Sequence, residues 1–277
     1  MFTPFRHQSP QEKSVPILLY HKITSEFGMG GVWNTPRQFR AQMEHLKSMG
    51  FEAVSPGKAF EDFQERTVVI TFDDGYEGVY EHAFPVLKEL GFTASIFLIT
   101  GYVGRSNEWD VNFGVKFRHL NWSQIEEMAG EGISFHSHTH THPNLTWLGD
   151  SELRDELTRS KMELEEKLGR PARYLSYPFG IYDARVKETA QEVGYEGCFS
   201  SYRGRRGRKD RYAMRRHGIY IIDTLWDLRA KIAGRDGISI RFEELKGKTI
   251  NFFAKGTYVV KRLQGARGEL HPVSEYD

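Results

Sequence analysis

Short apolar runs alternate along this chain with longer segments that have a helical period. The runs at 15–20 and 93–99 are apolar and rich in β-branched or aromatic residues, which predicts buried strands, and a further strand is predicted at 132–135. Segments 35–49 and 150–168 space their apolar residues three or four positions apart and end just before a glycine, which predicts helices. Further strands are predicted at 51–54, 68–72, 173–177, 195–200 and 217–222, and further helices at 76–90, 122–128 and 183–193. This alternation indicates an α/β fold with a parallel sheet wrapped by helices, most simply a barrel.

The apolar run from Val68 to Phe72 ends in two adjacent carboxylates, Asp73 and Asp74, which are followed by Gly75. A buried strand that delivers charge to the end of a sheet is typical of the place where α/β proteins keep their chemistry. Neighbouring strand residues point to opposite faces, so one aspartate is able to bind a cation while the other handles a proton. The alternative is that the pair only caps the helix predicted to follow, because Asp is a favoured N-cap residue.

Four alternating histidines, His136, His138, His140 and His142, follow another predicted strand. Two imidazoles four residues apart, with a carboxylate from a second strand, provide three metal ligands and leave a position open for water. The spacing fits both the 136/140 pair and the 138/142 pair, and periodicity does not choose between them. An exposed, tag-like run is the alternative, but the position at a strand end, with Asp74 available as third ligand, favours a metal site.

Length, charge and cysteine content exclude several classes of protein. With 277 residues, 39% of them hydrophobic, the chain is able to bury one large core, and a single α/β barrel of this length is ordinary. Lys+Arg 38 against Asp+Glu 37 gives a net charge of +1, so no global field indicates binding to nucleic acid or to an anionic membrane. The single cysteine, Cys198, excludes an internal disulfide framework.

The sequence also carries expectations about location. No stretch is long and apolar enough to span a bilayer, and residues 1–14 lack the apolar core of a signal peptide. We therefore expect a cytoplasmic protein for the sequence as given, whereas a chain whose leader had been removed would belong to the cell envelope or outside the cell. The oligomeric state is not indicated.

Three motifs, taken in order, resemble the polysaccharide deacetylase family, the NodB-like carbohydrate esterases of family 4. They are Thr71-Phe72-Asp73-Asp74-Gly75, the His-Thr-x-x-His run and Ser176-Tyr177-Pro178-Phe179-Gly180. The resemblance implies a distorted (β/α) barrel of seven or eight strands. We expect this domain at 15–237, after an N-terminal extension at 1–14 and before a C-terminal appendage at 238–277.

The resemblance also implies roles for individual residues. In the family the first aspartate of the pair is the general base and the second is a metal ligand, which carries over to Asp73 and Asp74. The histidine motif is similar to the variant in which the second ligand is followed by Pro and then x-Leu-Thr, as it is here at 143–146. His138 and His142 thus become the predicted ligands, and the 136/140 pair remains the alternative.

The sequence departs from the commonest family pattern in two places. Many members have Arg-Pro-Pro where Ser176-Tyr177-Pro178 stands, and many carry a late Leu-x-x-x-His motif that is absent here. Both changes resemble the branch that acts on poly-N-acetylglucosamine, in which an early Tyr-His and a late Arg take the vacated roles. His21 is therefore the predicted general acid, and Arg216 is predicted to orient Asp73. The alternatives are a histidine satisfied in the core, a surface arginine, and His217 as the acid.

The activity implied by the resemblance is a metal-dependent hydrolysis that removes N-acetyl groups from N-acetylglucosamine-containing poly- or oligosaccharides and releases acetate. The expected cofactor is a divalent metal, zinc first, although cobalt and nickel also suit two nitrogens and one oxygen. Tyr177 and Phe179 are expected to contact the substrate or its oxyanion. The alternatives are a deacetylase or deformylase of a small, lipid-linked or nucleotide-linked amino-sugar amide, and a non-catalytic glycan-binding module. The expected partner is a glycan, with no nucleic acid.

Overall fold

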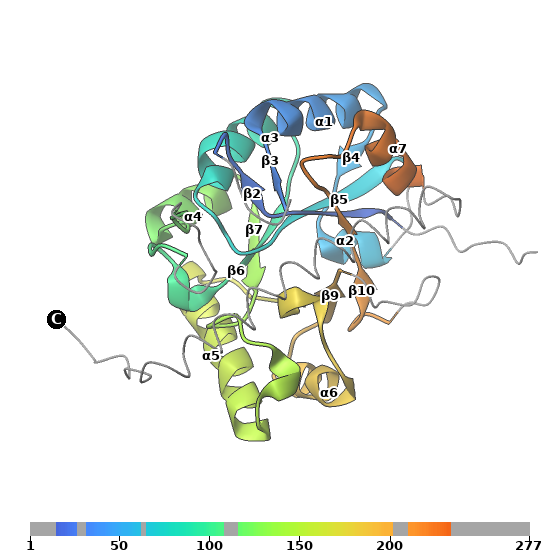
Figure 1. Ribbon diagram of the computed structural model, residues 1–277. Coiled ribbons are helices and arrows are strands. Elements are labelled where there is room, and N and C mark those ends of the chain that lie inside the picture. The colour runs from blue at the N-terminus through green and yellow to red at the C-terminus, as the bar shows by residue number, and fades with distance from the viewer. Residues whose placement is uncertain (1–14, 27–31, 62–64, 108–115, 202–209, 234–277) are drawn as a thin grey trace, which may run out of the picture.

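The computed structural model describes residues 15–26, 32–61, 65–107, 116–201 and 210–233. Within these residues a parallel sheet is surrounded by helices (Figure 1). The predicted N-terminal extension at 1–14 and the predicted C-terminal appendage at 238–277 lie outside the described residues.

The main sheet runs in the order β10-β9-β8-β7-β6-β5-β1-β11, and every neighbouring pair is parallel. Its strands are β1 (Ile17–Tyr20), β5 (Thr67–Phe72), β6 (Ser95–Leu98), β7 (Ser134–Ser137), β8 (Tyr174–Ser176), β9 (Gly197–Ser200), β10 (Met214–Arg215) and β11 (His217–Gly218). β4 (Glu52–Ala53) pairs with the start of β5, and β2 (Lys22–Ile23) pairs with β3 (Trp33–Asn34) in a separate small sheet.

The two ends of this strand order are joined by one short stretch of chain. β10 pairs with β9 and β11 pairs with β1, and only Arg216 separates β10 from β11. The N–H of Arg216 donates to the carbonyl of Ser200 at 3.0 Å, and the N–H of Ile219 donates to the carbonyl of Leu19 at 2.8 Å. Residues 214–218 therefore join the two edges of a nearly closed sheet, and the predicted distorted barrel of seven or eight strands is confirmed.

Side-chain alternation along the strands separates two apolar layers. Leu18, Ile70 and Ile96 belong to a cluster that packs outward against the helices, whereas Phe97 and Phe199 point inward. β6 and β9 are not neighbours in the sheet, so the 5.3 Å contact between the rings of Phe97 and Phe199 crosses the barrel interior. Burial of such a side chain stabilises the fold by about 1.5–3 kcal/mol.

The helices are α1 (Pro36–Ser48), α2 (Pro56–Glu61), α3 (Phe84–Leu90), α4 (Trp122–Gly130), α5 (Asp150–Leu168), α6 (Ala184–Glu192) and α7 (Leu225–Ala233). Their ends follow the sequence signals. Thr35 caps α1 in a capping box with Gln38, and Gly169 ends α5 with φ +59°. α1 and α3 cover one side of the barrel, while α5 and α6 cover another (Figure 1).

Two expectations about these elements were wrong, and two helices were not predicted. The helix predicted at 76–90 is a π-helix at Val79–Ala83 followed by α3, and Pro85, which lacks an N–H and does not fit a regular helix interior, stands at the junction. The strand predicted at 217–222 ends at Gly218, since the chain turns there with the N–H of Asp223 donating to the carbonyl of Tyr220 at 2.9 Å. Neither α2 nor α7 was predicted.

Candidate metal centre and catalytic residues

The site lies where parallel strands end at the same edge of the barrel. Asp73 and Asp74 follow the last residue of β5, and His138 follows the last residue of β7. One ligand atom each from Asp74, His138 and His142 lies within 4.8 Å of the others, and all three side chains are buried. In the described part of the chain this is the one cluster with the geometry of a metal site.

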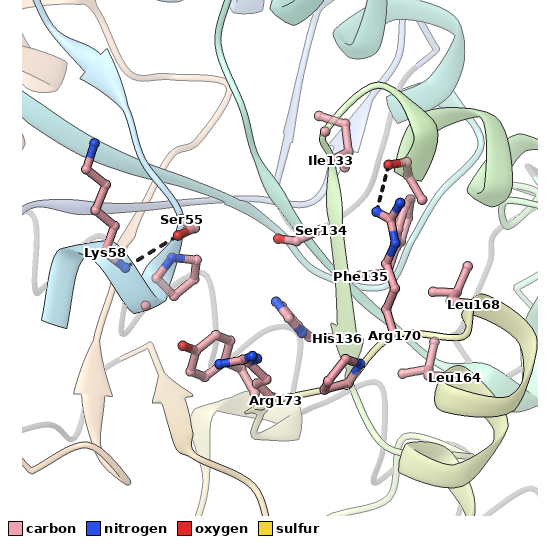
Figure 2. A pocket seen from close by; sticks show the side chains of 16 residues that line it. Ser55, Lys58, Ile133, Ser134, Phe135, His136, Leu164, Leu168, Arg170 and Arg173 are labelled. Atoms are coloured by element: carbon pink, nitrogen blue, oxygen red, sulfur yellow. Dashed lines mark hydrogen bonds between the residues drawn. The ribbon is translucent and has the colours of Figure 1, made fainter. Parts of the chain in front are cut away.

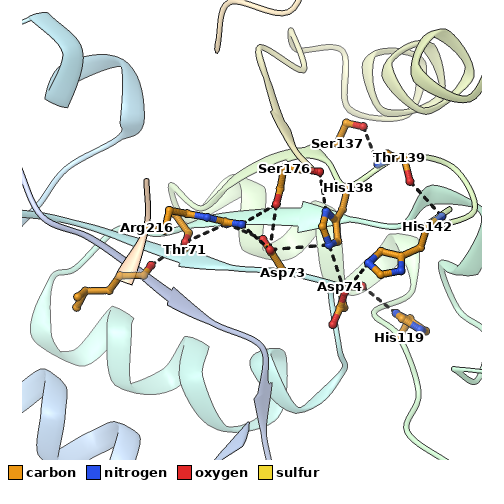
Figure 3. Close-up of polar contacts among 11 residues, drawn as sticks. Thr71, Asp73, Asp74, His119, Ser137, His138, Thr139, His142, Ser176 and Arg216 are labelled. Atoms are coloured by element: carbon orange, nitrogen blue, oxygen red, sulfur yellow. Dashed lines mark hydrogen bonds and ion pairs between the residues drawn. The ribbon is translucent and has the colours of Figure 1, made fainter. Parts of the chain in front are cut away.

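Within the cluster, the Nε2 atoms of both imidazoles lie close to the same oxygen of Asp74. His138 Nε2 lies 3.4 Å from Asp74 Oδ1, and His142 Nε2 lies 3.8 Å from the same atom (Figure 3). The two histidine rings meet edge to face at 4.7 Å. His138 Nδ1 donates to the carbonyl of Ser176 at 2.8 Å, so its Nε2 is directed at the carboxylate. Such an outer hydrogen bond orients an imidazole for metal binding.

The charges of these groups fit a cation. Burial opposes ionisation of Asp74, but the hydrogen bond to His138 and the charges of His21 and His142 outweigh it, and the pKa of Asp74 is well below its usual range. Burial, together with the charge of His138, lowers the pKa of His142 to about 3. An ionised carboxylate and a neutral imidazole are the protonation states that bind a metal ion. Burial lowers the pKa of His138, but the charge of Asp73 and the hydrogen bond to Asp74 raise it overall, so a metal ion would displace a proton from this imidazole. The residues present therefore fit the divalent metal that the sequence predicts.

The other two histidines are directed elsewhere. His136 packs between Phe97, at 5.7 Å, and Tyr174, at 4.8 Å, in the inner apolar layer. It also lines a cavity of about 710 Å³ around the first half of β7 and the start of β8 (Figure 2). His140 Nδ1 lies 2.8 Å from Thr100 Oγ1. Positive φ angles of 70° at residue 139 and 61° at residue 142 end the strand alternation and bring the 138/142 pair together instead.

Asp73 lies inside the barrel in a bidentate ion pair. Its Oδ1 and Oδ2 accept from Arg216 Nη1 at 2.7 Å and Nη2 at 2.6 Å, and both side chains are buried. Burial opposes ionisation of Asp73, but the charges of Arg216 and His138 and the hydrogen bond from Arg216 lower its pKa overall. The guanidinium lies 5.3 Å from the centre of Phe97 and 5.7 Å from that of Phe199. The interpretation of Arg216 as a surface residue is therefore wrong.

Ser176 links the two halves of the site, and the sequence analysis assigned it no role. Its Oγ donates to Asp73 Oδ2 at 3.0 Å and accepts from Arg216 Nη2 at 2.7 Å, while its carbonyl accepts from His138. Thr71 Oγ1 likewise accepts from Arg216 Nη1 at 3.3 Å and donates to the carbonyl of Leu18 at 2.7 Å. The sequence signal that could have identified Thr71 and Ser176 is that each is a hydroxyl residue near the end of a predicted strand, 68–72 and 173–177.

His21 follows the last residue of β1 at the same edge of the barrel. Burial lowers its pKa, the charges of Asp74 and Asp73 raise it, and the net direction is downward. Tyr20 is in register with Phe72, and the N–H of Asp73 donates to the carbonyl of Tyr20 at 3.0 Å, so the structure brings His21 beside the two carboxylates of the site. His217 lies in β11 in register with Leu18, in the middle of β1 and not at its end.

The two residues expected at the substrate differ in position. The Tyr177 ring stacks on Tyr182 at 4.8 Å, its hydroxyl donates to the carbonyl of Tyr212 at 3.0 Å, and its N–H donates to Phe199. The structure therefore does not bring Tyr177 to the site. Phe179 has a left-handed backbone with φ +58°, and its ring meets His142 at 4.7 Å. The turn Pro178–Gly180 thus lies beside the metal cluster.

The fold is a nearly closed parallel barrel, and its site combines an Asp-His-His cluster with a buried Asp–Arg pair. These features define the class: a barrel protein with a candidate metal centre. The family model for polysaccharide deacetylases matches residues 61–198. YxkH of Bacillus subtilis (strain 168), a protein named for this family, is 32% identical over 210 residues, which cover 73% of this chain and 70% of YxkH. The chain belongs to the polysaccharide deacetylase family, and the predicted enzyme class is confirmed.

Further relatives agree with this assignment. A poly-beta-1,6-N-acetyl-D-glucosamine N-deacetylase of Staphylococcus aureus (strain MRSA252) is 28% identical over 177 residues, which cover 59% of this chain and 59% of that protein. Among solved structures, IcaB from Ammonifex degensii superposes with a TM-score of 0.67 at 26% identity, covering 80% of this chain and 97% of IcaB. The Streptococcus pyogenes deacetylase PplD in complex with acetate has a TM-score of 0.70 at 24% identity, covering 79% and 98%, and shares the fold. No helix among the described residues has the length and apolar character to cross a membrane.

Proposed function

We propose that this protein is a metal-dependent hydrolase that removes N-acetyl groups from poly- or oligosaccharides containing N-acetylglucosamine and releases acetate. One observation carries the proposal: the Asp74–His138–His142 cluster lies directly beside the Asp73–Arg216 pair, with His138 Nε2 3.8 Å from Asp73 Oδ2. The candidate metal centre and the candidate base are therefore close enough to act on the same bound substrate. The name of the Staphylococcus aureus relative supports the choice of glycan.

Asp74, His138 and His142 would hold the divalent ion. Two imidazole nitrogens and one carboxylate oxygen suit zinc, and they also suit cobalt or nickel. When bound, such an ion polarises an amide carbonyl and lowers the pKa of water toward about 7. Three protein ligands leave a coordination position for this chemistry, as in other catalytic zinc sites.

Asp73 would act as the general base. Its low pKa keeps the carboxylate ionised at neutral pH, and Arg216 with Ser176 fixes the orientation of both oxygens. The water proton passes to Asp73 as the water oxygen bonds to the acetyl carbon. Because Arg216 is itself buried, it also stabilises the carboxylate in a region from which water is excluded.

His21 and Phe179 would complete the reaction. Addition of water places negative charge on the former carbonyl oxygen, and the turn that carries Phe179 lies beside His142, where a backbone N–H is able to stabilise that charge. The C–N bond then breaks, and the departing amine nitrogen takes a proton from His21. Because the pKa of His21 is lowered, its imidazole is neutral at rest, and the proton that it delivers is the one that Asp73 took from water. The products are acetate and a free amino sugar.

The experiment is acetate release from chitopentaose and from a poly-N-acetylglucosamine oligomer, measured with metal-stripped protein before and after addition of zinc. We expect acetate only in the presence of metal. Bound zinc without acetate from either glycan would contradict the polysaccharide substrate and favour a small or lipid-linked amide. A protein that binds the oligomers but no metal would favour a glycan-binding module.

A further inference from the structure

The metal-ligand candidate Asp74 lies in a turn with an unusual backbone. Asp74 has φ +69° and Gly75 has φ +70°, so two consecutive residues are left-handed. This conformation is unfavourable for an aspartate, and a Cβ at position 75 would collide with Leu98. Such a turn persists only where the surrounding structure fixes it.

A segment distant in sequence binds this turn along its length. The N–H of Glu77 donates to the carbonyl of Arg118 at 2.9 Å, and the N–H of Leu120 donates to the carbonyl of Gly75 at 2.8 Å. Between these two backbone bonds, His119 Nδ1 donates to the carbonyl of Asp74 at 2.9 Å (Figure 3). Of these three bonds, only the one from His119 reaches the backbone of the ligand residue itself.

His119 is itself fixed. Its ring stacks on Tyr76 at 4.9 Å with an interplanar angle of 18°, and its backbone N–H donates to the carbonyl of Arg105 at 2.8 Å. The side chain is buried, with 3% of its surface exposed. The imidazole is therefore a rigid donor whose position is set by Tyr76 and Arg105, and not by the metal ligands.

We propose that His119 is a positioning residue, which locks the left-handed backbone of Asp74 so that its carboxylate faces His138 and His142. The inference rests on the proposed function, since it takes Asp74 as a metal ligand. Outer partners of metal ligands usually bond the ligating group, whereas this one bonds the main chain of the ligand residue. Loss of an outer partner typically lowers metal affinity by about 10- to 100-fold, and we expect a loss in that range here.

Two substitutions separate the hydrogen bond from the packing. His119→Phe keeps an aromatic ring to stack on Tyr76 but has no donor, while His119→Asn places an amide N–H close to the position of Nδ1 but has no ring. We expect zinc affinity to fall by about 10- to 100-fold in the Phe variant and to recover most of that loss in the Asn variant. A residue that only fills space would show the opposite order.

The readouts are zinc affinity of the full chain by chelator competition and the visible absorption of the cobalt-loaded protein, whose bands report ligand geometry. Thermal unfolding of the metal-free variants controls for folding. If His119→Phe does not fold, His119→Gln replaces it, because its longer side chain moves the amide away from the Nδ1 position; we expect the same loss relative to Asn.

The outcomes distinguish this inference from the proposed function. Wild-type protein that binds zinc and releases acetate, together with a Phe variant of equal zinc affinity and an unchanged cobalt spectrum, would overturn the positioning role alone. Wild-type protein without zinc affinity would overturn the proposed function and this inference with it. A weakened Phe variant restored by Asn supports the positioning role even when no glycan is deacetylated.

Discussion

Asp73 and Asp74 are neighbours in sequence, yet they lie in two different environments. Asp73 lies within the barrel, above the aromatic layer, where it is held by Arg216 and Ser176. Asp74 lies at the rim in a left-handed turn, where it meets His138 and His142. Burial opposes ionisation of both carboxylates, yet the pKa of each is lowered, for Asp73 mainly by the cation of Arg216 and for Asp74 mainly by the imidazoles. The comparison teaches that the different partners of two adjacent carboxylates suit Asp73 to the proposed role of proton acceptor and Asp74 to the proposed role of metal ligand.

The largest effect on metal binding and activity is expected from a substitution at the rim, where Asp74 meets the histidines. His138→Ala removes a ligand whose Nε2 faces Asp74, so zinc affinity should fall by at least about 100-fold and acetate release should be lost with it. Metal content by atomic absorption and acetate release are the measurements. His140→Ala is the matched control and should retain zinc, because His140 contacts Thr100. Zinc loss in the control alone would reverse the ligand assignment.

A substitution of Asp73, the carboxylate inside the barrel, should reduce turnover without reducing metal binding. Asp73→Asn keeps the size of the side chain but removes the base, so turnover should fall by about 10²- to 10⁴-fold. Zinc content should stay near that of the wild type, because Asp73 is outside the three-residue cluster. Unchanged turnover with full zinc content would contradict the assignment of Asp73 as the base.

A smaller loss is expected at the residue that joins the two environments. Ser176→Ala removes the hydroxyl that bonds both Asp73 and Arg216 but keeps the backbone carbonyl that accepts from His138. Turnover should fall by about 10-fold, while zinc affinity should stay within a few-fold of the wild type. Ser95→Ala is the control, since its hydroxyl bonds Ser134 Oγ at 2.7 Å at the starts of β6 and β7, the ends opposite to the site. Equal losses in both variants would indicate a general packing defect.

The smallest effect concerns stability and pH. The pKa of Asp73 is lower in the folded state than its ordinary value of 3.8, so its contribution to stability is present above that value and is lost as the pH falls below it. In urea unfolding of the metal-free protein, the free energy of unfolding should therefore fall more steeply below about pH 4 in the wild type than in Asp73→Asn. If the free energy of unfolding has the same pH dependence in both proteins, the Asp73–Arg216 pair does not lower the pKa of Asp73.

Sequence patterns anticipated the parts of this molecule that depend on local signals. The apolar runs predicted the buried strands, and the carboxylates and histidines at strand ends predicted the residues that meet at the rim. Ser176 was passed over because its role depends on where β8 lies relative to β5 and on the closure of the barrel by Arg216. His119 gave no signal, since it lies in a segment without periodicity and acts through a backbone contact with a turn 45 residues away in sequence. The π-helix at Val79–Ala83 was not predicted, because a single wide turn of five residues leaves the apolar spacing of the segment close to that of an α-helix.

The closure of the barrel by residues 214–218 has a consequence for protein synthesis. Residue 216 leaves the ribosome after every other residue assigned to the site, so a nascent or truncated chain carries Asp74, His138 and His142 before it carries the cation that pairs with Asp73. Until then β1 and β9 present unpaired edges, which are prone to association with other chains. Joining of the two sheet edges and formation of the Asp73–Arg216 ion pair are therefore a single event, and chains that end before residue 214 lack both.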